Sequence, residues 1–160
     1  MMRPSPRDGA LGRHLLADLE GVAAEWLADP GLIESLLHDA ARTAGASPLF
    51  GKFHQFGEGL GVTGVLLLKE SHISIHTWPE YGFAAIDVFM CGNSRPDLAI
   101  EVLRKAFAPT RVYLTEQVRG VLEHRPNDER RYDLDLPSDA DCNPPDGPLA
   151  CIRRRSREYG

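Results

Sequence analysis

The sequence is short of cysteine, of positive charge and of long apolar runs, and each shortage excludes a class of protein. Its 3 cysteines are an odd number at wide spacing, which is not the pattern of a disulfide framework. A reducing cytoplasm is therefore the expected compartment. No segment approaches the apolar length of a membrane span, and the first residues lack the apolar run of a signal peptide. The cysteines are Cys91, Cys142 and Cys151.

The formal net charge of -5 argues against a nucleic-acid partner, because phosphate binding needs a basic surface. What is present is an ordinary globular composition, with 42% hydrophobic and 26% charged residues. A chain of 160 residues suits one domain that buries a core without metal or disulfide support.

Hydrophobic periodicity predicts a domain over residues 11–124, between a disordered N-terminus at 1–10 and a peripheral or disordered tail at 125–160. The predicted strands and helices imply an α+β fold, a two-layer sandwich in which one antiparallel sheet carries two helices on one face. A second copy is expected to cover the other face, so that the sheets pair in a homodimer. The strands are expected at 11–20, 50–56, 62–69, within the stretch 70–80, and at 83–90 and 111–118, and the helices at 30–44 and 96–107.

Several element boundaries have local signals. Asp29 and Pro30 are typical of a helix start, and Gly45 is typical of its end. The segment from Ser94 to Asp97 resembles a capping box, with Asp in place of the usual Glu or Gln. The apolar run at 62–69 predicts a strand that is buried on both faces or lies in a dimer interface.

The stretch from Glu70 to Glu80 gathers two histidines, two serines and two carboxylates. His72 and His76 would share a face on a helix and could bind one zinc ion, but the alternation here predicts a strand. Four residues of strand span about 13 Å, which is too far for one ion, so no metal is expected. A Ser-His hydrolase is also disfavoured, because Ser71 lacks a glycine-flanked elbow.

Self-processing at the Glu70–Ser71 bond is the third interpretation. A serine hydroxyl can attack the preceding carbonyl and turn the peptide bond into an ester, and loss of the α-proton then leads to a pyruvoyl group and ammonia. This chemistry needs a strained or firmly held bond, a base and donors for the oxyanion. His72 and His76 are the base candidates, and Thr63 is a candidate hydroxyl donor.

The run ESHISIHTWPEYGFAAID, from Glu70 to Asp87, followed by Cys91-Gly92, closely resembles the prokaryotic S-adenosylmethionine decarboxylase proenzymes. The resemblance extends over about residues 11–119. Supporting matches are Gly12-Arg13-His14-Leu15, Phe53-His54 and Val62-Thr63-Gly64-Val65.

The resemblance implies cleavage between Glu70 and Ser71, giving a β chain of residues 1–70 and an α chain that begins at Ser71 as a covalent pyruvoyl group. It assigns removal of the α-proton during processing to His76, and protonation of the substrate carbon to Cys91. Phe56 and Glu80 match positions expected to hold the adenine ring and the ribose of S-adenosylmethionine. The family's fold, a two-layer protomer that pairs sheets in a homodimer, agrees with the fold predicted from periodicity.

In such enzymes the pyruvoyl carbonyl forms a Schiff base with the substrate amine, and the adjacent carbonyl takes up electrons as carbon dioxide leaves. The implied product is the aminopropyl donor for spermidine and other polyamines. Thr63 stands where serine is expected, and its β-branching predicts slower processing. Two alternatives stay open, a pyruvoyl-dependent decarboxylase of ornithine or arginine and a non-cleaving, non-catalytic homologue.

Overall fold

The computed structural model describes residues 10–121, 134–135 and 153–154, and the chain divides into two compact units, Met1–Glu123 and His124–Gly160. In the second unit, β7 (Leu134–Asp135) pairs antiparallel with β8 (Arg153–Arg154). The remaining expectations for the tail at 125–160, and those for the N-terminus before Ala10, fall outside the described residues.

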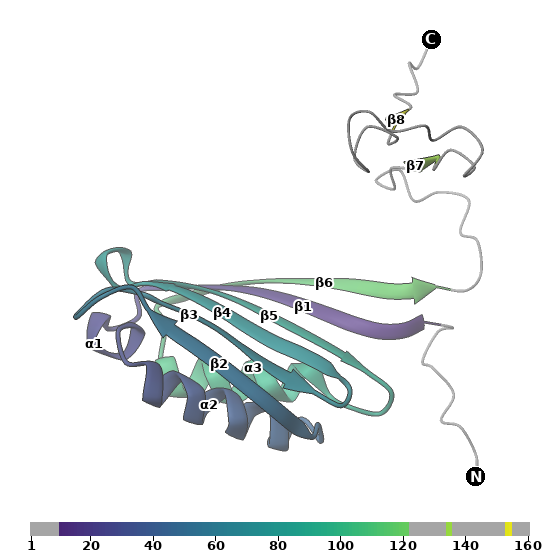
Figure 1. Cartoon of the computed structure of the whole chain (residues 1–160), viewed down its shortest axis with the longest axis horizontal. Helices are drawn as coiled ribbons and strands as arrows, with labels where there is room; N and C mark the ends of the chain where they lie inside the picture. Colours follow the sequence, from purple (N-terminus) through teal and green to yellow (C-terminus); the bar gives the residue numbers. More distant parts are fainter. Residues whose placement is uncertain (1–9, 122–133, 136–152, 155–160) are drawn as a thin grey trace, which may run out of the picture. The chain divides into compact units, whose positions relative to one another are not determined.

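The first unit is built on a six-stranded sheet with the strand order β2-β3-β4-β5-β1-β6, in which every neighbouring pair is antiparallel. Helices α2 and α3 lie together on one side of this sheet (Figure 1). This confirms the predicted α+β class with two helices on one face. The strands are β1 (Ala10–Glu20), β2 (Pro48–Gln55), β3 (Val62–Leu68), β4 (Ser71–Trp78), β5 (Phe83–Cys91) and β6 (Arg111–Val121).

The helices are α1 (Ala24–Leu27), α2 (Pro30–Thr43) and α3 (Pro96–Phe107), and a 3-10 turn, η2 (Pro79–Tyr81), connects β4 to β5. The cap of α2 is as predicted, since the Asp29 carboxylate accepts a hydrogen bond from the Leu32 N–H at 2.9 Å. Within the described part of the chain, no helix has the length and apolarity needed to cross a membrane.

The predicted capping box at the start of α3 is wrong. Arg95, not Ser94, is the N-cap residue, and its side chain makes no capping bond. The reason is Pro96, whose fixed φ suits the first helical position and so makes the preceding residue the cap. Asp97 in the first turn binds the Arg95 and Arg13 guanidinium groups instead.

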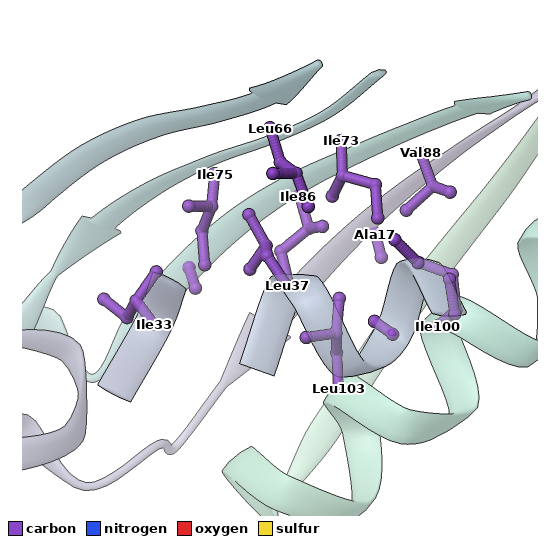
Figure 2. Packing of buried hydrophobic residues seen from close by; sticks show 14 of the residues in the cluster. Ala17, Ile33, Leu37, Leu66, Ile73, Ile75, Ile86, Val88, Ile100 and Leu103 are labelled. Carbon is purple, nitrogen blue, oxygen red and sulfur yellow. The ribbon is translucent and has the colours of Figure 1, made fainter. Parts of the chain in front are cut away.

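The core lies between the sheet and the two long helices. Figure 2 shows Ile33 and Leu37 of α2 packed near the sheet residues Leu66, Ile75 and Ile86. Alternation along each strand selects these residues, because every second side chain points toward the helices. Members of the cluster with no more than 2% exposure include Leu15, Ala17, Ile33, Leu37, Leu66, Ile73, Ile75, Ile86, Val88 and Leu103.

The opposite face of the sheet, here called the open face, carries no helix within the described residues (Figure 1). Large apolar side chains on it stay accessible, with exposed fractions of 38% for Leu16, 45% for Leu67 and 39% for Trp78. The prediction that β3 is buried on both faces is therefore wrong for the single chain, because alternation sends Leu67 to this face. The alternative, that β3 lies in a dimer interface, stays a prediction.

Candidate active site

The Glu70–Ser71 bond lies in the tight connection between β3 and β4, and its geometry is unusual. Ser71 has a φ of 145°, and the only other non-glycine residue with positive φ in the described ranges is Ala108. A side chain in this region of φ costs about 1–3 kcal/mol and persists only where the surroundings hold it. The backbone is thus strained at the bond where the sequence predicts cleavage.

The surroundings hold Glu70 from two sides. Its carbonyl oxygen accepts a hydrogen bond from the Cys91 N–H at 3.1 Å. Its carboxylate accepts bonds from the N–H of Ser47 at 2.8 Å and from the Ser47 hydroxyl at 3.4 Å, while the Ser47 carbonyl accepts from the Lys69 N–H at 3.0 Å. The Glu70 carbonyl is therefore fixed and polarised by a backbone donor aimed at it.

The Ser71 hydroxyl lies 3.1 Å from Nδ1 of His72. Cys91, which the strand register places one residue beyond the partner of Ser71, carries a free and exposed thiol. Glu70, Ser71 and Cys91 thus meet at one end of β4, and they are referred to here as the scissile group.

The other predicted residues gather toward the opposite end of β4. Thr63 is the register partner of His76, and its hydroxyl lies 2.9 Å from Nδ1 of that histidine. Phe56, His76 and Glu80 line a cavity of about 330 Å³ together with Trp78. Phe56, Thr63, His76 and Glu80 are referred to here as the histidine group. The neighbouring hollow of about 450 Å³, lined by Glu20, Trp78, Tyr81 and Phe83, contains none of the predicted residues.

Within one chain the two groups do not meet. Ser71 and His76 are five residues apart on the regular strand β4, which corresponds to about 16 Å along the strand. His76 is close to Ser71 in the sequence but not in the folded chain. Each group is therefore only part of a site that would use both.

A second polar cluster borders the scissile group on the open face. The Arg119 guanidinium lies 3.3 Å from Nδ1 of His14 and 5.5 Å from the centre of the Phe89 ring. Because arginine only donates, this His14 nitrogen must accept, which fits a neutral ring. Burial lowers the pKa of His14, against the opposing effect of the Asp87 carboxylate.

Sequence reasoning did not find Ser47 or the Cys91 N–H as parts of the site. The Cys91 bond and the shorter of the two Ser47 bonds come from main-chain N–H groups, which every residue but proline possesses, so residue type does not identify them. The Arg119–His14 contact was missed as well, because it joins residues far apart in the sequence. Among the described residues, no group of three or more His, Cys, Asp or Glu side chains could hold a metal ion.

Comparison with known proteins gives consistent results. A family model described as S-adenosylmethionine decarboxylase matches residues 13–120. The S-adenosylmethionine decarboxylase proenzyme of Thermodesulfovibrio yellowstonii is 43% identical over 117 residues, covering 72% of this chain and 86% of the relative. That of Persephonella marina is 48% identical over 113 residues, covering 70% and 84%. The crystal structure of the adenosylmethionine decarboxylase from Aquifex aeolicus matches with a TM-score of 0.67 and 39% identity, over 74% of this chain and 98% of that one.

Proposed function

The chain belongs to the S-adenosylmethionine decarboxylase family, and on that premise we propose that it cuts itself between Glu70 and Ser71 and decarboxylates S-adenosylmethionine. The observation that carries the proposal is the geometry of the scissile bond. A strained Ser71 follows a carbonyl that already receives a hydrogen bond from Cys91. The product is the aminopropyl donor for polyamine synthesis.

Self-processing relieves the strain that the fold imposes. The Ser71 hydroxyl attacks the Glu70 carbonyl carbon, the Cys91 N–H stabilises the negative oxygen that forms, and the C–N bond breaks to leave an ester. Removal of the Ser71 α-proton then expels the Glu70 carboxylate from Cβ, and water releases ammonia. Ser71 is thereby converted to the pyruvoyl group at the start of the α chain.

The pyruvoyl group supplies an electron sink for the α-carbon of an amino acid that loses carbon dioxide. The residues around Ser71 suit such a group, since hydrogen bonds from Ser47 and Cys91 hold Glu70 beside it and the Ser71 hydroxyl contacts the His72 ring. The Cys91 thiol, exposed beside this position, is proposed to return the proton to the α-carbon. That role needs a reduced thiol, which supports a cytoplasmic location.

A complete site requires two copies of the chain. His76 lies on the open face, about 16 Å along β4 from Ser71. It therefore cannot reach the α-proton of Ser71 in its own chain. In a two-fold pairing of open faces, the histidine group of each copy meets the scissile group of the other, and two identical sites result. The exposed Leu16, Leu67 and Trp78 on this face support the pairing. We therefore propose a homodimer in which His76 acts on the partner chain.

The histidine group also suits the nucleoside part of the substrate. Phe56 is 62% exposed at the cavity and offers a ring on which adenine can stack. The Glu80 carboxylate on the same cavity can accept hydrogen bonds from the ribose hydroxyls. Ornithine and arginine have neither an adenine ring nor a ribose, and this favours S-adenosylmethionine over a free basic amino acid as the substrate.

The intact mass of the denatured protein tests processing. Two chains of residues 1–70 and 71–160, the second without an amino terminus, are expected in place of one 17.7 kDa species. Ser71→Ala should remain a single chain. Carbon dioxide release from S-adenosylmethionine, ornithine and arginine then identifies the substrate. A wild-type protein that stays at 17.7 kDa on incubation would favour the non-catalytic homologue.

Co-expression of two inactive variants tests the two-chain site. Ser71→Ala and His76→Ala should each remain uncleaved alone. In their mixed dimer, one site combines Ser71 of the His76→Ala chain with His76 of the Ser71→Ala chain, so only the His76→Ala chain should be cut. Distinct affinity tags identify the mixed dimer and the cut chain. An isolated mixed dimer with no cleavage would contradict action on the partner.

A further inference from the structure

The contact between the Ser71 hydroxyl and the His72 ring is not expected for neighbours in a regular strand. Successive strand side chains point to opposite faces, so residues i and i+1 do not normally touch. Here the φ of 145° at Ser71 breaks the alternation, and Oγ lies 3.1 Å from Nδ1 of His72. The strained backbone therefore aims the reacting hydroxyl at a ring nitrogen that can accept its proton.

The imidazole of His72 is held in place by aromatic rings on the open face. The Phe89 ring meets it edge-on with centroids 5.9 Å apart, and the His14 ring does so at 6.2 Å. Edge-to-face arrangements in this distance range are favourable. His72 is also partly buried, which limits the orientations that its side chain can adopt. The base is therefore positioned before the reaction begins.

Building on the proposed function, we infer that His72 is the general base for ester formation, a stage distinct from the α-proton removal assigned to His76. As Oγ of Ser71 bonds to the Glu70 carbonyl carbon, its proton passes to Nδ1 of His72, and the oxygen that becomes negative is held by the Cys91 N–H. When the C–N bond breaks, the same proton passes from His72 to the departing Ser71 nitrogen. The ester and a free amine result, and no proton is gained or lost overall.

The two histidines then act at different stages, the first of which needs one chain and the second of which needs two. Ester formation uses Ser71, His72 and the Cys91 N–H, all present in a single chain. The Nδ1 atom of His76 is instead hydrogen-bonded to the Thr63 hydroxyl in the histidine group. The α-proton that His76 is proposed to remove lies on Ser71 of the partner chain. Dimerisation is thus needed only for the second stage.

The test measures the two stages separately. Hydroxylamine cleaves esters but not peptide bonds, so a His76→Ala protein that accumulates the ester is cut at residue 70 on treatment. Adding His72→Phe, which keeps a ring against Phe89 but cannot accept a proton, should slow the appearance of hydroxylamine-sensitive material by about 10²–10⁴-fold. In the otherwise wild-type chain, His72→Phe should slow self-cleavage by a similar factor.

Two controls separate chemistry from folding. His38→Phe makes the same substitution on α2, on the helix-covered side of the sheet, and should leave the cleavage rate unchanged. Free imidazole should restore cleavage to His72→Ala, because the deleted side chain leaves room for it; a residue that only shaped the site would not be rescued. Wild-type cleavage rates in His72→Phe would overturn the inference and leave the proposed function intact, whereas a wild-type chain that never cleaves would overturn the proposed function itself.

Discussion

Replacing Ser71 by glycine and by alanine separates the backbone strain at the proposed cleavage site from the loss of the hydroxyl. Both variants lack the proposed nucleophile, so both should remain uncleaved and can be compared as intact chains. In a regular strand glycine is less stable than alanine by about 0.5–1 kcal/mol, because it loses more backbone freedom on folding. At a φ of 145° the order should reverse, since only glycine occupies this region without steric cost.

The expected size follows from these opposing contributions. Relief of about 1–3 kcal/mol of strain, less the entropic cost of glycine of about 0.5–1 kcal/mol, leaves Ser71→Gly more stable than Ser71→Ala by up to about 2.5 kcal/mol. For a chain of this length each kcal/mol shifts Tm by about 2–4 °C. Urea unfolding of both variants at one fixed protein concentration measures the difference, because stability of a dimer depends on concentration.

The matched control is Ser74, which lies on the same strand without positive φ and whose hydroxyl bonds to Asp87 at 3.3 Å. Ser74→Ala should be more stable than Ser74→Gly by about 0.5–1 kcal/mol, the usual difference between alanine and glycine in a strand. If the Ser71 pair shows the same order as the Ser74 pair, the backbone at the cleavage site stores no strain, and strain cannot be a driving force for processing.

Three further predictions concern stability. Leu37→Ala, at a fully buried position between α2 and the sheet, should cost about 2–5 kcal/mol in urea unfolding, and a loss below 1 kcal/mol would mean that the helix layer is loosely packed. Thr77→Val should cost about 1–3 kcal/mol, because the buried hydroxyl donates to the Leu27 carbonyl at 2.6 Å and accepts from the Val62 N–H at 2.7 Å; an unchanged denaturation midpoint would contradict this. Burial lowers the pKa of His14 from 6.5, so protonation favours the unfolded chain and stability should fall as the pH drops below about 6.5. In His14→Gln the free energy of unfolding should differ less between pH 8 and pH 5.5 than it does in the wild-type protein. An equal pH dependence in both proteins would show that His14 is not the cause.

The layered fold could be predicted from the sequence because burial follows local periodicity. In β5, alternation assigns Ile86 and Val88 to the core and Asp87 and Phe89 to the other face, and burial agrees. The order of strands could not be predicted in this way. Nothing in the alternation of β1 shows that it lies between β5 and β6, because any strand with the same pattern could pair there.

The sequence predicts the members of the candidate site but not their arrangement. The closeness of Ser71 and His76 in the sequence suggests one compact site, while the strand β4 separates them. No sequence motif marks Ser47 as a residue that holds Glu70, because the shorter of its two hydrogen bonds to Glu70 comes from its main-chain N–H. The unusual φ of Ser71 is likewise hidden, since serine has no preference for that conformation.

The strand order has a consequence for the lifetime of an enzyme cut as proposed. The proposed cut falls between β3 and β4 and would leave β1 on the first chain, although β1 lies between β5 and β6 of the second. The two chains are therefore interleaved across the sheet, and neither can leave without breaking strand pairs on both sides of β1. Once unfolded, the separated chains would have to find each other again, so refolding becomes concentration-dependent and competes with aggregation. The working life of the mature enzyme is then set by how slowly it unfolds.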